Sequence, residues 1–237
     1  METQKTPRLL SFLDVLAVIA VVTAFLLVLF YAPVELTMGV VQKVFYFHVA
    51  SAWTGMLGFL VATVAAILYL RSGNPKWDIA SLAGIEIGIV FVALCILSGM
   101  LWARPVWNTW WTWDPRLTTA LIMELVYAAY LLLRNGVDDA QRRARISAVY
   151  AIVGFISVPL TFLSIRIFRT IHPVLVGAAD PSTGTFAMAP RMLVAFLSSL
   201  AAFSFLFVAL YWHRYRLGRM QNTVQQKYLE LETEDAE

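Results

Sequence analysis

Six long apolar segments constrain this chain more than any other feature of its sequence. They lie near residues 10–32, 45–70, 79–101, 117–133, 146–167 and 191–212. A helix needs about 20 predominantly apolar residues to cross a bilayer, and each segment approaches or exceeds that length. Because 60% of the chain is hydrophobic and only 14% is charged, a soluble globular fold is excluded. The sequence predicts an all-α integral membrane protein with six transmembrane helices.

The connections between the apolar segments are short and rich in turn-forming residues. Pro33, residues 72–75 (Ser-Gly-Asn-Pro) and residues 135–136 (Asn-Gly) all favour turns. No connection is long enough to hold a soluble domain. We therefore predict one membrane domain over residues 1–237.

The distribution of basic residues predicts the orientation of the chain in the membrane. With a cytoplasmic N-terminus, twelve of the eighteen Lys and Arg residues fall on the cytoplasmic side and six on the outer side. Basic residues favour cytoplasmic loops, so both termini are predicted to be cytoplasmic. Residues 214–237 then form a cytoplasmic tail, and residues 102–116 form an outer loop.

Residues 102–116, called the Trp segment below, hold five of the eight tryptophans of the chain. They are Trp102, Trp107, Trp110, Trp111 and Trp113. Tryptophans of an interfacial belt are usually spread over several helix ends, whereas these lie in one connection. We favour a platform for a flat aromatic ligand over an ordinary belt.

Two of the three histidines are predicted to lie on the same side as the Trp segment. His48 falls near the outer end of the second apolar segment, and His172 falls just beyond the fifth. A lone histidine at a helix end is usually an interfacial or packing residue, and we interpret His213, at the cytoplasmic end, in that way. Two imidazoles beside an aromatic segment suit a haem with two axial nitrogen ligands. We predict His48 and His172 as those ligands.

Charged residues of the outer side are candidate partners for the carboxylates of such a ligand. Arg104, Arg116 and Arg169 are the leading candidates, with contacts to lipid headgroups as the alternative. Asp114 precedes Pro115, a pattern typical of a helix start, so Asp114 has two interpretations. It caps the fourth helix, or it contacts the ligand, and one residue could serve both purposes.

Several other functions find no support in the sequence. Cys95 is the single cysteine, which excludes an internal disulfide. No Gly-rich phosphate loop is present, and the basic residues cluster at helix ends instead of forming a nucleic-acid surface. We find no conventional catalytic constellation, so the only enzymatic activity considered is a haem-lyase-like transfer.

Residues 107–118, Trp-Asn-Thr-Trp-Trp-Thr-Trp-Asp-Pro-Arg-Leu-Thr, resemble the WWD signature of the haem-handling proteins of cytochrome c maturation. The length of the chain is most similar to that of the short branch of this family, haem exporter protein C (CcmC). In two places the chain departs from the family pattern. Asn108 stands where the family usually has Gly, and Pro115 where it usually has a small residue.

The resemblance implies a specific role in cytochrome c biogenesis. A family member binds haem b non-covalently on the outer face of the bacterial inner membrane, with one axial histidine on each side of the WWD loop. His48 and His172 match those positions, and Trp107, Trp110, Trp111, Trp113 and Asp114 match the signature. The haem is then presented to a periplasmic CcmE-like haem chaperone for covalent attachment. The implied partners in the membrane are CcmA- and CcmB-like subunits of an ABC transporter and a small CcmD-like single-helix subunit.

Two alternatives remain open at the level of sequence. A b-type cytochrome that transfers electrons would also ligate haem through histidines, commonly within helices at membrane depth. A permease subunit of an ABC transporter could use the Trp segment as a docking surface with no haem. An optical spectrum of the purified chain would separate these alternatives.

Overall fold

The protein is a bundle of helices with six candidate membrane spans, as the sequence predicts. The computed structural model describes residues 6–173 and 188–234, in which the regular elements are helices except for one isolated β-bridge. Six helices are long and apolar enough to cross a membrane: Arg8–Tyr31, Val40–Ser72, Pro75–Trp107, Pro115–Asn135, Ala140–Ile167 and Pro190–Glu234.

These spans contain seven α-helices and two shorter helical turns. The first span consists of α1 (Arg8–Leu26) and the π-helix η1 (Leu27–Tyr31). The second joins the 3₁₀ turn η2 (Val40–Lys43) to α2 (Val44–Ser72). The others are α3 (Pro75–Trp107), α4 (Pro115–Asn135), α5 (Ala140–Gly154) with α6 (Ser157–Ile167), and α7 (Pro190–Glu234).

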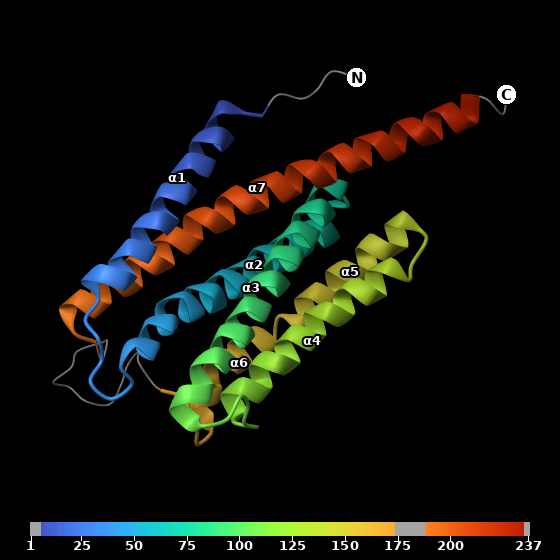
Figure 1. The fold of residues 1–237 in the computed structure, drawn as a ribbon. Coiled ribbons are helices and arrows are strands. Elements are labelled where there is room, and N and C mark those ends of the chain that lie inside the picture. Colours follow the sequence, from blue (N-terminus) through green and yellow to red (C-terminus); the bar gives the residue numbers. More distant parts are fainter. Residues whose placement is uncertain (1–5, 174–187, 235–237) are drawn as a thin grey trace.

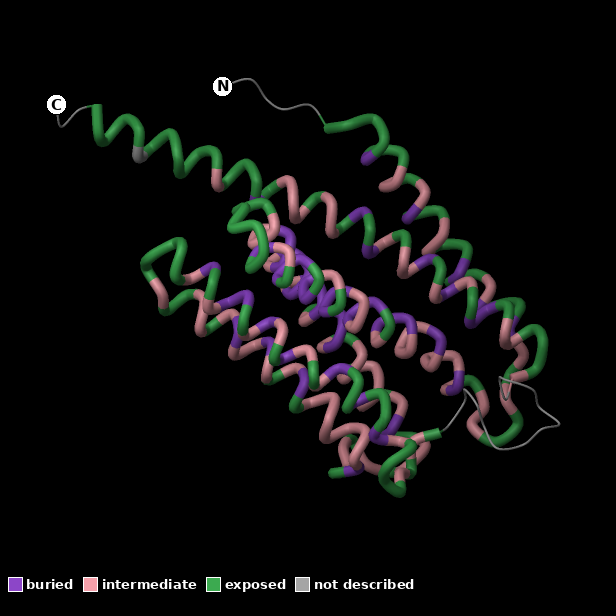
Figure 2. The backbone as a smooth tube through the Cα atoms, turned by 180° about the vertical axis from the view of Figure 1, so that it is seen from behind, coloured by how far each residue is buried: buried purple, intermediate pink, exposed green. Residues whose placement is uncertain are grey.

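The helices are arranged around a central pair, α2 and α3 (Figure 1). On one side of this pair α1 packs against α7, which also contacts α2 and α3. On the other side lie α4, α5 and α6. Figure 2 shows buried residues concentrated in the central pair, whereas α1 and the end of α7 are largely exposed. The described ends of the chain lie at the same end of the bundle, and the Trp segment lies at the opposite end.

Side-chain caps define where several helices begin. Asn74 accepts a hydrogen bond from the backbone N–H of Lys76 at the start of α3, and Pro75 occupies the first helical position. The residue before them, Gly73, ends α2 with a left-handed φ of 64°. Asp139 caps α5 in the same way as Asn74 caps α3. The turn signals seen in the sequence therefore act as helix boundaries.

Close contact between α2 and α3 depends on glycines that face each other. A Cβ atom added to Gly84 would lie 2.7 Å from the carbonyl oxygen of Gly58 and 3.1 Å from Cβ of Ala62. Gly55 and Gly88 make a similar approach nearer the Trp end. Small residues in membrane helices allow such backbone contact. Gly55 and Gly58 of α2 therefore serve helix packing.

Gly84→Ala is therefore expected to destabilise the bundle. The new methyl group meets a backbone oxygen that cannot rotate away, and overpacking of this kind costs about 1–3 kcal/mol. Thermal unfolding of the purified protein in detergent measures the effect. Gly136→Ala is the matched control, because its Cβ would be no nearer than 3.6 Å to any other group. Equal midpoints for the two variants would contradict this account of the interface.

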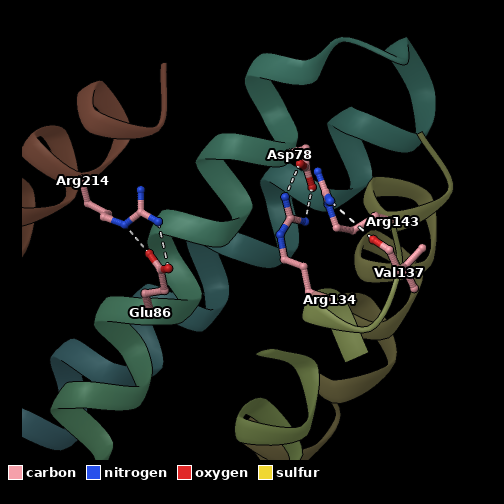
Figure 3. Close-up of polar contacts among 6 residues, drawn as sticks. All are labelled: Asp78, Glu86, Arg134, Val137, Arg143 and Arg214. Atoms are coloured by element: carbon pink, nitrogen blue, oxygen red, sulfur yellow. Dashed lines mark hydrogen bonds and ion pairs between the residues drawn. The ribbon is translucent and has the colours of Figure 1, made fainter. Parts of the chain in front are cut away.

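Ion pairs join the helices toward the end that carries the chain termini. Figure 3 shows Arg134 of α4 bound to Asp78 of α3, with a 2.7 Å hydrogen bond between Nη1 and Oδ1. Arg214 of α7 binds Glu86 of α3, with Nη2 2.8 Å from Oε1. Glu86, the single carboxylate of the apolar segment 79–101, thus pairs with an arginine from a distant part of the chain.

Two helices extend beyond the apolar segments that predict them. The apolar pattern ends near residue 101, but α3 continues through Pro105 to Trp107, so the first part of the expected 102–116 loop is helical. The cytoplasmic tail expected over 214–237 continues α7 as a helix to Glu234, and its last three residues lie outside the described residues. Gln, Lys, Leu and Glu dominate the end of α7, and all four favour helix without needing a buried face.

Candidate haem site

The two histidines predicted as ligands lie side by side at the Trp end of the bundle. His48 is in the second turn of α2, and His172 follows α6 in a non-helical segment. The centres of their imidazole rings are 6.4 Å apart, and the ring planes are inclined by 32°. The structure therefore brings together two side chains that are 124 positions apart in the sequence (172 minus 48).

His48 is held by one face of α3. Its Nδ1 lies 2.9 Å from the carbonyl oxygen of Cys95 and 3.2 Å from Oγ of Ser98. The ring packs directly over Gly99, where an added Cβ would come within 2.9 Å of Cε1 of His48. Since a carbonyl oxygen can only accept, Nδ1 carries the proton and Nε2 keeps its lone pair, with Sγ of Cys95 3.8 Å away.

His172 has the same arrangement of hydrogen bonds. Its Nδ1 lies 3.2 Å from the carbonyl oxygen of Pro173, so Nε2 is again the nitrogen that keeps its lone pair. Burial, followed by the nearby Arg116 guanidinium, holds the pKa of His172 below its usual value. The neutral imidazole, which is the form that binds metals, is therefore favoured at neutral pH.

The spacing of the two rings fits a single metal ion between them. A metal–imidazole nitrogen bond is about 2.0 Å long, and the ring centre lies about 1 Å behind the nitrogen, so two rings on opposite sides of one ion have centres about 6 Å apart. The observed 6.4 Å is close to this value. Nδ1–H donation to a carbonyl is the usual way in which a protein orients a metal-binding histidine.

A cavity of about 320 Å³ surrounds both histidines and is called the histidine cavity below. Trp102, Trp107, Trp110 and Trp111 line it, together with Arg116. Six methionines also line it: Met38, Met56, Met100, Met123, Met188 and Met192. Methionine side chains are flexible and polarisable, so this wall can adapt to the shape of a large apolar ligand.

Four residues predicted for the site lie outside the wall of the histidine cavity, and one of them, Asp114, is described separately below. Trp113 is 73% exposed, with its ring edge-on to that of Trp111. Arg104 donates hydrogen bonds from Nη1 to the backbone and side-chain oxygens of Asn108, both at 2.8 Å. Arg169 is exposed beyond the end of α6. Ligand contact by Trp113, Arg104 and Arg169 stays a prediction.

Asn108 ends α3 in a left-handed conformation, with φ of 55°. It is the only described residue other than glycine with a positive φ. Glycine adopts this conformation without strain, and asparagine is the next most common residue there. The departure from the family's usual Gly therefore preserves the backbone turn that directs the chain from α3 into Trp110 and Trp111.

Asn108→Ala is expected to lower the thermal unfolding midpoint, whereas Asn108→Gly should leave it nearly unchanged. A Cβ in the left-handed conformation costs about 1–2 kcal/mol, and the polar side chain of asparagine offsets much of this cost through local hydrogen bonds, whereas alanine cannot and glycine has no Cβ. Each kcal/mol corresponds to a shift of roughly 2–4 °C for a chain of this size. Both variants lose the side-chain contact with Arg104, so the comparison isolates the backbone effect. A thermal unfolding midpoint for Asn108→Gly as low as that for Asn108→Ala would contradict the proposed backbone effect.

Asp114 caps α4 and also holds the segment that carries His172. Its Oδ1 accepts hydrogen bonds from the backbone N–H of Arg116 (2.9 Å) and from Oγ1 of Thr170 (2.7 Å). Its Oδ2 accepts from the backbone N–H of Ile171 at 2.9 Å. Burial alone would raise the pKa of Asp114, but these three hydrogen bonds outweigh it and hold the pKa below its usual value. The capping interpretation is confirmed, and the link to His172 had no signal in the sequence.

Arg116 connects α4 to α6 and faces the histidine cavity. Its Nη1 donates to the carbonyl oxygens of Thr161 (2.9 Å) and Phe162 (3.1 Å), which leaves Nε and Nη2 as further donors. The charged residue best placed for a ligand carboxylate is therefore Arg116.

His213, in contrast, lies far from the site. It contacts Asp14 of α1 at 2.9 Å.

Comparison with known proteins decides the family. The family model described as heme exporter protein C matches residues 2–230. The chain belongs to the haem exporter protein C family. Among curated relatives, heme exporter protein C of Bradyrhizobium diazoefficiens is 35% identical over 193 residues, which cover 81% of this chain and 70% of that protein. The protein of the same name from Rhodobacter capsulatus is 29% identical over 87% of this chain and 85% of its own length.

The Escherichia coli K12 relative, also named heme exporter protein C, is 29% identical over 60% of this chain and 58% of that protein. Membership confirms the resemblance of the Trp segment to this family and assigns the chain to cytochrome c biogenesis as a multi-pass membrane protein that handles haem. The two alternatives left open by the sequence, an electron-transferring cytochrome and a permease subunit without haem, are set aside.

Proposed function

We propose that this chain binds haem b in the histidine cavity and presents it to a periplasmic haem chaperone for covalent attachment. The observation that carries the proposal is the pair of imidazoles of His48 and His172, whose ring centres lie 6.4 Å apart in one cavity and whose Nδ1 atoms face carbonyl oxygens, so that each Nε2 keeps its lone pair. Each imidazole binds the iron from one side. A bis-imidazole site gives low-spin iron and leaves no open position for oxygen chemistry.

Other residues of the site orient the haem and hold its carboxylates. Trp107, Trp110 and Trp111 flank the macrocycle, since aromatic rings pack favourably on flat conjugated ligands. Arg116 binds a propionate through its remaining N–H donors. Asp114 contributes by fixing the position of the segment before His172, without contacting the iron.

Release is the role of the His172 segment. His48 lies on a long helix and is held by two groups of α3, whereas His172 lies on a non-helical segment whose residues Thr170 and Ile171 bind Asp114. A ligand on such a segment can leave the iron at lower cost than one on a packed helix. In the proposed transfer, His48 keeps the haem in place while the His172 side opens to the chaperone.

The site faces the periplasm in this proposal, and both termini are in the cytoplasm of the bacterial cell. Support comes from the basic residues of the sequence, twelve of which fall on the predicted cytoplasmic side and six on the predicted outer side. The membrane is the inner membrane. The proposed partners are the CcmE-like chaperone, the CcmA- and CcmB-like transporter subunits and a CcmD-like single-helix subunit, since membership of the family implies partners from this maturation system.

Transfer in a purified system tests the function. The chain is reconstituted in nanodiscs, loaded with haem b and mixed with the chaperone under reducing conditions, and covalent haem on the chaperone is followed by mass. We expect an adduct with the wild-type chain and none with empty nanodiscs. A haem-loaded chain that exchanges electrons with added redox dyes but yields no adduct would contradict the proposal and favour a cytochrome.

A further inference from the structure

Two residues that line the histidine cavity each hold a buried polar atom that lacks a hydrogen-bond partner among the described residues. The two atoms are Nε1 of Trp102 and Oε1 of Gln42. Buried polar groups in native proteins are nearly always paired, so an unpaired group at the wall of a cavity indicates a partner that enters the cavity. The chemistry of these two atoms therefore indicates which polar groups a ligand would present to them.

Trp102 gives the clearer information. An indole N–H can only donate, so its partner is a hydrogen-bond acceptor. The carboxamide of Gln42 presents either an oxygen or an N–H, depending on which way the group is turned, and does not define the sign of its partner. The cavity thus offers a donor at Trp102 with no acceptor from the described chain to satisfy it.

The position of Trp102 relates this donor to the iron site. Cys95, Gly99 and Trp102 follow each other at spacings of four and three residues, which places them on one face of α3. Cys95 and Gly99 hold the ring of His48, and Trp102 lies one turn closer to the Trp end. The indole ring of Trp102 is fixed edge-on to that of Trp107, with ring centres 5.0 Å apart.

A haem held by His48 carries its acceptors at its periphery. Haem b has two propionate carboxylates, and the rest of its edge consists of methyl, vinyl and methine groups that accept no hydrogen bond. A carboxylate is also the partner that gives an N–H donor its strongest hydrogen bond. The guanidinium of Arg116 lines the same cavity and favours a negative group there.

We propose that the indole N–H of Trp102 donates a hydrogen bond to a propionate of the bound haem, and that this bond helps the cavity to select tetrapyrroles with free carboxylates. The inference rests on the proposed function, because it requires haem in the histidine cavity. It assigns to Trp102 a polar role in addition to its aromatic surface.

The test compares two ligands that differ only in their carboxylates. Iron protoporphyrin IX and its dimethyl ester are titrated into the wild-type chain, Trp102→Phe and Trp77→Phe in nanodiscs, and binding is followed by the low-spin absorbance. Trp77→Phe is the matched control, since Trp77 lies at the first turn of α3, outside the cavity. Substitution of Trp102 by 3-benzothienylalanine replaces the N–H by sulfur while it keeps the size of the ring.

We expect both changes at Trp102 to weaken binding of the free acid roughly 10-fold to 100-fold, the range for a hydrogen bond to a charged group. Binding of the ester should change much less, and Trp77→Phe should change neither. Equal weakening of acid and ester would overturn the inference and leave Trp102 a packing residue. Unchanged binding of the acid in the benzothienyl variant would also overturn it. If the wild-type chain bound neither porphyrin, the proposed function itself would fall.

Discussion

Replacing both His48 and His172 by glycine is expected to abolish stable haem retention while the chain stays folded in the membrane. Each imidazole supplies one axial bond to iron, and neither side chain holds two helices together through a buried ion pair. The single variants should lose the low-spin absorbance in large part, and the double variant should lose it completely. Absorbance of the purified variants, at matched protein level, measures the effect.

Added imidazole should partly restore the low-spin absorbance in each single variant. The glycine leaves a space of the shape of the missing ring, and the hydrogen-bond acceptors that oriented the original imidazole remain, such as the carbonyl oxygen of Cys95. His213→Gly is the control and should leave the spectrum unchanged, because His213 contacts Asp14 at the other end of the bundle. Unchanged low-spin haem in the double variant would refute the assignment of the axial ligands.

Asp114→Ala is expected to weaken haem binding strongly although Asp114 does not line the cavity. The substitution removes the acceptor of three hydrogen bonds, two of which hold Thr170 and Ile171 just before His172. Loss of a cap costs about 1 kcal/mol, and hydrogen bonds to a charged group are worth about 1.5–3 kcal/mol. Without these hydrogen bonds the His172 segment can move and no longer holds its imidazole in position. Haem affinity should therefore fall about 10-fold to 100-fold.

Asp114→Asn should have a smaller effect than Asp114→Ala. An asparagine retains one oxygen, which can still cap α4 and accept from Thr170, but its amide cannot accept from Ile171. Asp139→Ala is the matched control, because it removes the equivalent cap of α5 at the far end of the bundle. It should lower the unfolding temperature without changing haem affinity. A haem affinity of Asp114→Ala equal to that of Asp139→Ala would rule out the positioning role.

The sequence predicts the membrane class, the six spans and the family, because each depends on local patterns. Apolar length defines a span, and the Trp segment carries its signature within a dozen residues. The cap at Asp114 is equally local, since Asp followed by Pro marks a helix start. The left-handed turn at Asn108 also has a local signal, because asparagine tolerates a positive φ better than other residues with a Cβ, but only the backbone angle shows that the turn is there.

Contacts between distant segments could not be predicted from the sequence. Nothing near Asp114 indicates that it binds Thr170 and Ile171, which lie 56 and 57 positions away. The contact between His48 and Gly99 is equally hidden in the sequence, because it forms only when α2 and α3 pack together. The predicted use of Arg104 as a ligand partner rests on its position beside the tryptophans and stays a prediction. The contact of its guanidinium with Asn108 at the end of α3 had no signal in the sequence.

Pulsed electron paramagnetic resonance of the ferric, haem-loaded chain tests the central claim most directly. With protein labelled with ¹⁵N only at histidine, two ¹⁵N-imidazole couplings to the iron are expected in the wild-type chain, one in His48→Gly, one in His172→Gly and two in His213→Gly. Fewer than two histidine couplings in the wild-type chain, or two that persist in His172→Gly, would contradict the account.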